Sequence, residues 1–266
     1  MEPLKPANIE DYTHWLETQH GIRITERTRT YYGTVAATVR SRFFGSELWT
    51  TLCASLREYD GEYRVSTGGY VLLTSEAQPE LFIKPFDSFL LKTFRRNILD
   101  NTRWPEAPDG GWILPEDWYS QINDVVRTMV SVKYLDGVEF LIDKVTAHCA
   151  GYGLACQTSL EAREEGYYAA HLTLRQEFEV PRPTWDTLRI PMKIEIQVTT
   201  QLQEVIRVLL HRHYERRRQL ATDAGELKWQ WDYRSDEFVA NYLGHILHYV
   251  EGMIMNVRAK QQELRT

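Results

Sequence analysis

A strand with one polar face carries the carboxylate that is best placed for acid–base chemistry. Apolar and polar residues alternate from Met192 to Thr199, which predicts a half-buried strand with Glu195 and Gln197 side by side on its polar face. A carboxylate held on a strand can deprotonate a hydroxyl or share a metal ion. The pattern taken alone is more often that of a structural strand with solvated charges.

Basic side chains gather after this strand and again near residue 90. A helix is expected to begin near Thr200 and to turn Val205, Val208 and Leu209 inward. Its far end is cationic and suits phosphate groups, with His211, Arg212, Arg216, Arg217 and Arg218. Earlier in the chain, a stripe on one helix face is expected from Lys84, Ser88, Lys92, Arg95 and Arg96. Cations at this spacing can bracket a triphosphate, although a solvated basic face is the ordinary alternative.

Two shorter sequence patterns also contain candidate functional residues. Asp124 begins an expected buried strand that holds Arg127, and a carboxylate there could bind Mg²⁺, a hard ion that takes oxygen ligands. An aspartate that caps a turn is an equally good interpretation. Tyr167 follows a glycine and precedes His171, so its ring could stack on a nucleic-acid base. A core tyrosine is the ordinary alternative.

The elements that must position these residues alternate between helices and strands. Helices are expected over 9–17, 26–44, 85–97 and 138–152. Two more are expected to begin at capping serines, one after Ser46 and one from Ser235 to about Lys260. In the second helix, four-residue steps place Tyr31, Val35, Val39 and Phe43 inward. Strands are expected over 125–134, 154–159, 171–176 and 190–199. The Trp- and Pro-rich stretch 100–118 predicts an ordered loop. This order indicates an α/β or α+β fold with a small mixed sheet flanked by helices.

Composition limits the function classes. The chain has 266 residues, 43% of them hydrophobic, and a net charge of −6, so any surface that binds nucleic acid must be local. The three cysteines show no CxxC spacing, which favours a reduced, cytoplasmic protein over a zinc site. No apolar run approaches the roughly 18 residues of a membrane helix, so no membrane partner is expected.

The candidate residues occur in an order that resembles the synthetase domain of the RelA/SpoT family. The resembling motifs are K-x-x-x-S-x-x-x-K from Lys84, Asp124 before a strand with Arg127, G-Y-x-x-x-H from Gly166, E-I-Q-x-x-T from Glu195, and a late helical His at position 211. They span residues 84 to 214, about half of the chain.

This resemblance implies a nucleotidyltransferase-like fold and a pyrophosphokinase, which moves the β,γ-pyrophosphate of ATP to a 3′-hydroxyl. Three domains are expected: a helical extension at 1–66, the synthetase core at 67–220, and a helical extension at 221–266. Glu195, Asp124 and Gln197 would be catalytic, and Mg²⁺ would bind Asp124 and Glu195. Substrate would be bound by Lys84, Ser88, Lys92, Arg95, Arg96, Arg127, Tyr167, His171 and His211.

Departures from the family pattern favour its divergent, toxin-like branch, the toxic small alarmone synthetases. Phe82, Thr199 and Leu210 stand where the usual synthetases carry Arg, Arg and Glu. Members of this branch are implicated in pyrophosphorylating the 3′ CCA end of tRNA, and Arg212, Arg216, Arg217 and Arg218 would then bind RNA. A neutralising antitoxin would be a further partner.

Three alternatives stay open. The acceptor could be a guanosine or adenosine nucleotide, which would give a (p)ppGpp- or (p)ppApp-type alarmone. The chain could be a catalytically inactive nucleotide- or RNA-binding module, which would not need Glu195. It could also be an interaction protein that uses the aromatic segment Trp104–Trp118 as its contact, although internal packing explains those rings more simply.

Overall fold

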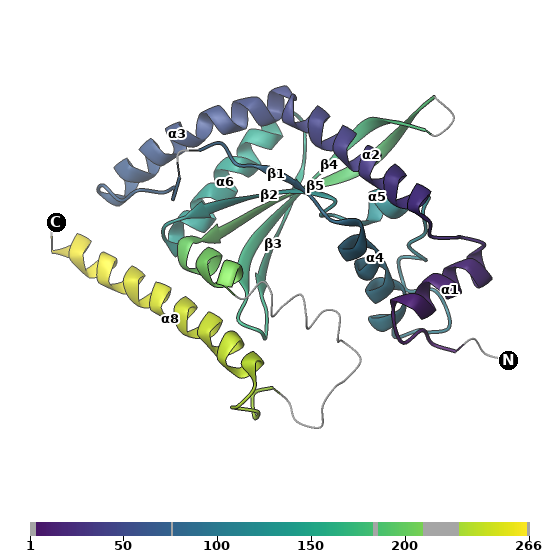
Figure 1. Cartoon of the computed structure of the whole chain (residues 1–266). Helices are drawn as coiled ribbons and strands as arrows, with labels where there is room; N and C mark the ends of the chain where they lie inside the picture. The colour runs from purple at the N-terminus through teal and green to yellow at the C-terminus, as the bar shows by residue number, and fades with distance from the viewer. Residues whose placement is uncertain (1–3, 76, 183–185, 210–228, 265–266) are drawn as a thin grey trace. The chain divides into compact units, whose positions relative to one another are not determined.

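A computed structural model describes residues 4–75, 77–182, 186–209 and 229–264 (Figure 1). Contacts divide the chain into two units. Unit 1 contains residues 1–45, 81–127 and 175–194, and unit 2 contains residues 46–80, 128–174 and 195–266. The division into three domains that the sequence suggested stays a prediction. Among the helices that the structure describes, none combines the length and apolarity needed to cross a bilayer.

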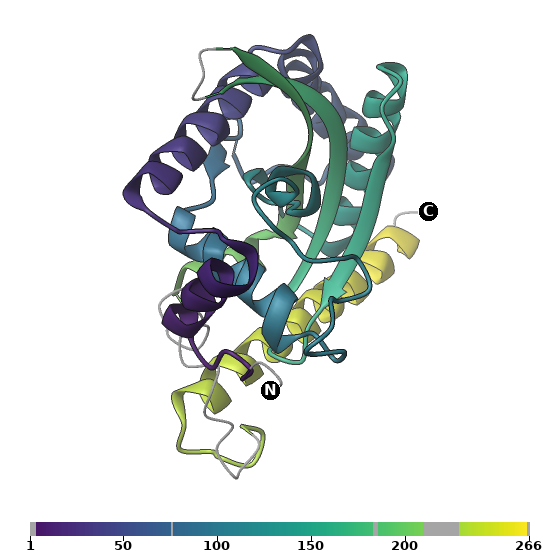
Figure 2. The same cartoon turned by 90° about the vertical axis from the view of Figure 1, so that its right-hand side faces the viewer.

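The sheet has five strands in the order β1-β2-β5-β4-β3. Their bounds are β1 Leu81–Ile83, β2 Val126–Val132, β3 Cys156–Ala162, β4 Tyr168–Pro181 and β5 Thr187–Thr200. β3 and β4 pair antiparallel, with Ser159 opposite His171, and run side by side in Figure 2. Strands β2, β4 and β5 each contribute residues to both units. The predicted fold class, a small mixed sheet flanked by helices, is confirmed.

The helices of unit 1 form where the sequence supplies caps and apolar periodicity. They are α1 (Ile9–His20), α2 (Glu26–Phe44), α4 (Phe86–Phe94), the π-helical turn η1 (Arg95–Leu99) and α5 (Trp118–Gln121). Asn8 caps α1, and Thr25 forms a capping box with Thr28 at the start of α2. On α2 the prediction for Tyr31 was wrong, because Tyr32 is buried and Tyr31 is only half-buried. Four-residue steps drift around a helix of 3.6 residues per turn, so the buried face shifts by one position.

The aromatic segment packs inside unit 1. The ring of Trp15 lies 5.8 Å from that of Trp104 and 4.9 Å from that of Trp112. The buried Asn97 fixes the segment from the π-helical turn: its amide donates to the Ile113 carbonyl at 3.0 Å, and its carbonyl accepts from the Ile113 amide at 2.9 Å. The expected ordered loop is confirmed, and its tryptophans are used for internal packing.

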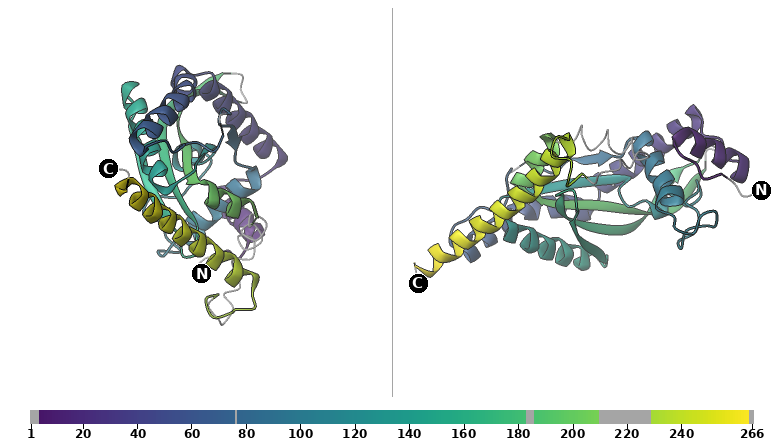
Figure 3. Two further views of the ribbon diagram at one scale, coloured as in Figure 1. Left: turned by 90° about the vertical axis from the view of Figure 1, so that its left-hand side faces the viewer. Right: turned by 90° about the horizontal axis from the view of Figure 1, so that it is seen from below.

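Unit 2 contains the helices α3 (Glu47–Thr67), α6 (Leu135–Gly151) and α8 (Asp236–Glu263), the last of which ends near the C-terminus in Figure 3. Ser46 and Ser235 cap α3 and α8, as the sequence predicted. Gly244 of α8 packs against Gly166, which has a positive φ of 76°. A Cβ added to Gly244 would lie 2.3 Å from the Gly166 carbonyl oxygen, so this contact requires glycine.

Residues 201–209 are helical, as predicted, but their buried face differs from the predicted one. Val205, Val208 and Leu209 are exposed, whereas Gln203 and Ile206 are buried. Gln203 is turned inward, and its side-chain amide donates to the Gly244 carbonyl at 3.5 Å. The inward face is therefore shared between one polar and one apolar side chain, which an apolar pattern alone cannot reveal.

Candidate functional site

Two ammonium groups converge on one carboxylate in unit 1. Lys84 Nζ donates to Asp124 Oδ2 at 2.9 Å, and Lys92 Nζ donates to Asp124 Oδ1 at 2.8 Å. Lys84 follows β1 and is buried, its carbonyl accepting from the Tyr32 hydroxyl at 2.8 Å. Lys92 lies on α4 with its side chain 29% exposed. We call Lys84, Lys92 and Asp124 the cationic cluster, because two positive charges face one negative charge.

Burial and charge act in opposite directions on these groups. Burial alone would raise the pKa of Asp124, but the charges of Lys84 and Lys92 outweigh it and hold this pKa well below its usual range. Burial lowers the pKa of Lys84, and the Asp124 carboxylate opposes that shift only in part. The carboxylate is therefore ionised at neutral pH, and one of the two cations is partly accessible to an incoming anion.

The predicted helical stripe was wrong at both of its ends. Lys84 lies before α4, because Pro85 follows it and a residue before proline is disfavoured in the α-helical region. Arg95 and Arg96 belong to the π-helical turn, whose wider spacing rotates them away from α-helical positions. Arg96 donates to the Gln121 carbonyl at 3.0 Å, and Ser88 is half-buried on α4.

Unit 1 holds further cations, and two of them, Lys193 and Arg175, were not predicted as site residues. The charge of Arg127 contributes to the lowered pKa of Lys84. Burial lowers the pKa of Lys193, and the charges of Arg96 and Arg175 lower it further. Lys193 also donates to the side-chain carbonyl of Asn123 at 3.0 Å. Lys193 stands two residues before Glu195 in the alternating pattern of β5, and this spacing is the signal that could have identified it.

In unit 2, four predicted residues form one series of polar contacts. The Tyr167 hydroxyl lies 3.3 Å from His171 Nε2, and His171 Nδ1 lies 3.3 Å from Glu195 Oε2. Gln197 Nε2 then donates to Glu195 Oε1 at 2.5 Å. Glu195 and His171 are buried. We call Tyr167, His171, Glu195 and Gln197 the carboxylate cluster.

The contacts of this cluster orient Glu195. An ionised carboxylate can only accept, so a proton on His171 Nδ1 would face Glu195 Oε2. The Tyr167 hydroxyl and His171 Nε2 share a hydrogen bond whose direction depends on the tautomer of the ring. Gln197 donates to the other oxygen of Glu195, so both carboxylate oxygens have fixed partners. This arrangement orients a buried carboxylate in the way that a general base requires.

The ring of Tyr167 is half-buried and has a cationic neighbour. The guanidinium of Arg163 lies 5.4 Å from the ring centroid, and Arg163 also pairs with Glu161. Burial raises the pKa of Tyr167 to about 12, with a further contribution from the charge of Glu161. The phenol is therefore neutral at physiological pH and can donate to His171. Arg163 lies over one face of the ring, so a base that stacked on the opposite face would leave this contact in place.

The structure thus brings the predicted residues together in two sets, each within its own unit. Strand β5 belongs to both units, with the unpredicted Lys193 in unit 1 and Glu195 and Gln197 of the carboxylate cluster in unit 2. The remaining predicted residues fall outside the described part of the chain: His211, Arg212, Arg216, Arg217 and Arg218.

A magnesium site at Asp124 and Glu195 stays a prediction. Within residues 4–75, 77–182, 186–209 and 229–264, no three His, Cys, Asp or Glu side chains gather in a way that could hold a metal ion. Each of the two carboxylates nevertheless supplies the oxygen ligands that Mg²⁺ prefers. The low pKa of Asp124 keeps it ionised, as a ligand must be, although both of its oxygens also accept from lysines.

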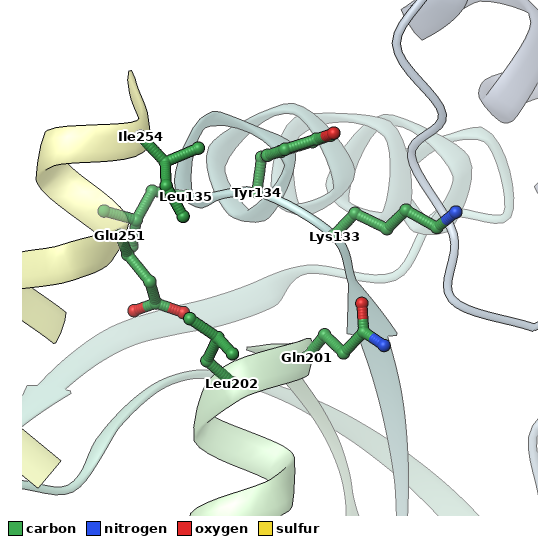
Figure 4. Close-up of a pocket in the computed structure, with 7 residues that line it drawn as sticks. All are labelled: Lys133, Tyr134, Leu135, Gln201, Leu202, Glu251 and Ile254. Atoms are coloured by element: carbon green, nitrogen blue, oxygen red, sulfur yellow. The ribbon is translucent and has the colours of Figure 1, made fainter. Parts of the chain in front are cut away.

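Unit 2 also has a pocket of about 210 Å³ that contains none of the predicted site residues. It is lined by Lys133, Tyr134, Leu135, Gln201, Leu202, Glu251 and Ile254 (Figure 4). Glu251 is buried, and its carboxylate accepts a hydrogen bond from Thr200. The lining mixes apolar and oppositely charged side chains, so it does not have the concentrated positive charge that would bind a triphosphate.

Comparison with known proteins identifies the fold. No family model matches the sequence, and no curated protein matches it either. Among solved structures, a GTP pyrophosphokinase family protein from Streptococcus pneumoniae is similar with a TM-score of 0.52 and 15% identity, over 90% of this chain and 95% of that one. Small alarmone synthetase 1 from Bacillus subtilis is similar with a TM-score of 0.51 and 12% identity, over 90% and 97% of the two chains.

The same Bacillus subtilis protein bound to its product pppGpp is similar with a TM-score of 0.51 and 12% identity, over 89% of this chain and 97% of that one. These likenesses extend well beyond the region that carries the motifs, since they include nearly all of each chain. The five-stranded sheet with its flanking helices therefore has the fold of the small alarmone synthetases.

Proposed function

We propose that the chain is an ATP-dependent pyrophosphokinase that transfers the β,γ-pyrophosphate of ATP to a 3′-hydroxyl. The observation that carries this proposal is the carboxylate cluster, in which Glu195 is buried and oriented by His171 and Gln197. Glu195 accepts the proton of the acceptor hydroxyl. The acceptor oxygen forms a bond to the β-phosphorus, the bond from the β-phosphorus to the α,β-bridging oxygen breaks, and AMP leaves.

The cationic cluster is proposed to bind the phosphates of ATP. Lys92 is the accessible member, and its ammonium group can exchange part of its bond to Asp124 for a phosphate oxygen. Lys84 is buried and holds Asp124 in place. Mg²⁺ is the proposed cofactor, with Asp124 and Glu195 as its candidate ligands, and when bound it would neutralise negative charge on the phosphates.

For the acceptor we propose the 3′ end of tRNA, which would make the chain a translation-inhibiting toxin with a neutralising antitoxin as a partner. Phe82 supports this choice: it stands where nucleotide synthetases of the family usually carry Arg, and its side chain is 51% exposed. A compact nucleotide acceptor would lose a cation there, whereas a tRNA end presents phosphates along a stem. Arg212, Arg216, Arg217 and Arg218 remain the candidate RNA contacts.

A purine nucleotide is the second candidate acceptor, and the fold favours it. The similar Bacillus subtilis structure contains pppGpp, which is a product of transfer to a guanosine nucleotide. Synthesis of a (p)ppGpp- or (p)ppApp-type alarmone would need the same carboxylate cluster and the same donor. The two acceptors therefore have to be distinguished by an assay, since Glu195 serves both of them.

The experiment incubates the protein and Mg²⁺ with γ-labelled ATP and, in separate reactions, bulk tRNA, GDP, GTP or AMP. A parallel reaction with α-labelled ATP should release labelled AMP, because pyrophosphate transfer produces AMP and monophosphate transfer produces ADP. Label on tRNA supports the toxin proposal, and label on a nucleotide alone replaces it with alarmone synthesis. If no acceptor is labelled and no AMP appears, while ATP binding is retained, the chain is an inactive binding module.

A further inference from the structure

A short loop between strands β3 and β4 leads directly into Tyr167, and we call residues 163–166 the Tyr167 loop. The loop is closed by two backbone hydrogen bonds. The Gly166 amide donates to the Arg163 carbonyl at 2.9 Å, and the Arg163 amide donates to the Tyr167 carbonyl at 3.0 Å. The loop lies beyond the last residues that pair between the two strands. Its position is therefore not set by the ladder of the sheet and must be set by another element.

Helix α8 is that element, because it lies directly against the loop. A Cβ added to Gly166 would collide with the Asn241 carbonyl oxygen and would lie 3.1 Å from Gly244 Cα, and both glycines are buried. The other side of the helix is apolar and exposed, for example at Ile246 and Tyr249. Helix and loop thus meet backbone to backbone, with no room for a side chain between them.

One imidazole of α8 bonds to the chain on both sides of Tyr167. His245 Nε2 lies 2.8 Å from the Glu164 carbonyl oxygen, and His245 Nδ1 lies 2.8 Å from the Tyr168 hydroxyl. A carbonyl oxygen can only accept, so His245 Nε2 carries a proton and donates it to this bond. The Tyr168 ring also stacks on His248, with centroids 3.7 Å apart and planes at 10°. His245 therefore holds the backbone shortly before Tyr167 and the side chain that follows it.

We propose that His245 is a positioning residue for the acceptor, which holds the Tyr167 ring ready to stack on the acceptor base. The inference rests on the proposed pyrophosphokinase function, in which Tyr167 binds that base. A ring that is held in place before binding needs less ordering when the acceptor arrives, and the affinity is higher for it. The proposed ATP site is the cationic cluster, which contains no residue of α8 or of the Tyr167 loop. The KM for ATP should therefore not depend on His245.

The test compares substitutions at His245 that remove both bonds or keep one of them. His245→Ala removes both and should raise the KM for the acceptor by roughly 5- to 50-fold, with the KM for ATP unchanged. His245→Gln can place an amide N–H near the position of Nε2, so it should retain most of the wild-type affinity through the bond to Glu164. The shorter amide of His245→Asn reaches only the position of Nδ1, so this variant should behave more like His245→Ala.

His148→Ala is the matched control. His148 is a half-buried histidine of α6 in the same unit, and its Nε2 lies 3.3 Å from the Leu48 carbonyl oxygen, so it makes a similar contact away from the Tyr167 loop. This variant should lower the thermal midpoint and leave both KM values unchanged. If His245→Ala raises both KM values, or if His148→Ala raises the acceptor KM equally, the role is a general structural one and the proposal is overturned.

A double-mutant cycle tests whether His245 acts through Tyr167. In a Tyr167→Ala background, His245→Ala should change the KM for the acceptor by less than about twofold, because the ring that it positions is already absent. Effects of the two substitutions that multiply in full would show that His245 does not act through the ring, and would overturn the proposal.

Hydrogen exchange over residues 160–170 separates this inference from the proposed function. The amides of Arg163 and Gly166, which bond within the loop, should exchange roughly tenfold faster in His245→Ala and at the wild-type rate in His148→Ala. Unchanged exchange and an unchanged acceptor KM in an active His245→Ala protein overturn the inference alone. A wild type that transfers pyrophosphate to no acceptor overturns the proposed function, and the acceptor role of His245 with it.

Discussion

His171 Nδ1 lies 3.3 Å from Glu195 Oε2, and the imidazole thereby links the catalytic carboxylate to the Tyr167 hydroxyl. The contact orients Glu195. It does not follow from the position of Glu195 on its own strand, since it joins neighbouring strands β4 and β5.

Replacing the carboxylate should abolish most of the transfer without unfolding the protein. Glu195→Gln keeps the side-chain volume but cannot accept the acceptor proton, so kcat should fall by roughly 10²–10⁴-fold. His171→Phe should lower kcat less and leave the KM for ATP unchanged, because it removes orientation and keeps the base. Glu179→Gln, a half-exposed strand carboxylate paired with Arg189, is the control and should retain activity. Near wild-type transfer by Glu195→Gln would show that Glu195 is not the base.

Tyr167 should contribute through its ring and, to a smaller extent, through its hydroxyl. Tyr167→Ala should raise the KM for the acceptor by roughly 5- to 150-fold, since base stacking on an aromatic ring is worth roughly 1–3 kcal/mol. Tyr167→Phe should keep that KM and reduce kcat by less than about tenfold, which corresponds to one lost hydrogen bond to His171. Steady-state kinetics with the acceptor and ATP varied in turn measure both effects. Equal changes for the two substrates would indicate a packing role.

Asp124 should stabilise the fold as well as the site. Asp124→Asn leaves the buried Lys84 without its counter-charge, and loss of one partner of a buried ion pair costs roughly 3–5 kcal/mol. Lys92→Met should cost less, because that side chain is 29% exposed. Urea unfolding of the three proteins measures the differences. A larger loss from Lys92→Met than from Asp124→Asn would contradict this assignment.

The pH dependence of stability has a definite sign. The pKa of Asp124 is lower in the folded protein than its value of about 3.9 in an unfolded chain. The ionised carboxylate therefore stabilises the fold above about pH 4, and this contribution decreases as the pH falls through the folded pKa. Wild type should lose stability more steeply than Asp124→Asn between about pH 4 and pH 2. Parallel curves would show that Asp124 does not titrate as assigned.

Two glycines of one helix should respond in opposite ways to the same substitution. Gly244→Ala should lower the thermal midpoint, because the new Cβ would lie 2.3 Å from backbone that cannot move aside. Gly252→Ala should raise it, because nothing lies within 4 Å of that Cβ and alanine favours a helix interior by roughly 0.5–1 kcal/mol. Calorimetry of the two variants measures the difference. Similar midpoints would mean that α8 does not dock through Gly244.

Local signals in the sequence predicted most of the secondary structure. The bounds of α2 and the caps at Ser46 and Ser235 follow from apolar periodicity and from side chains that accept helix N–H groups. The prediction that Tyr31 points inward was wrong because a four-residue step only approximates the 3.6 residues per turn of an α-helix. The outward apolar face of α8 could not be predicted, because periodicity reveals two faces of a helix and does not say which one the protein covers.

The candidate site was less predictable because its contacts join distant segments. The sequence suggested Lys84 and Lys92 as phosphate ligands. It could not show that both of them also bond to Asp124, which is distant from them in the sequence. The link from Glu195 to His171 likewise depends on which strands are neighbours. The sequence alone could have placed Lys84 outside the helix, because Lys84 precedes Pro85 and a residue before proline is disfavoured in the α-helical region.

The π-helical turn at the end of α4 makes the chain sensitive to deletion there. Such a turn holds one residue more than an α-helical turn. Deleting Arg95 or Arg96 would restore α-helical geometry but would rotate the following side chains by about 100°. Asn97 would then lose its bonds to Ile113 and to the Tyr12 hydroxyl, which together hold the aromatic segment. A deletion before Asn97 within this turn would therefore release the aromatic segment from the end of α4.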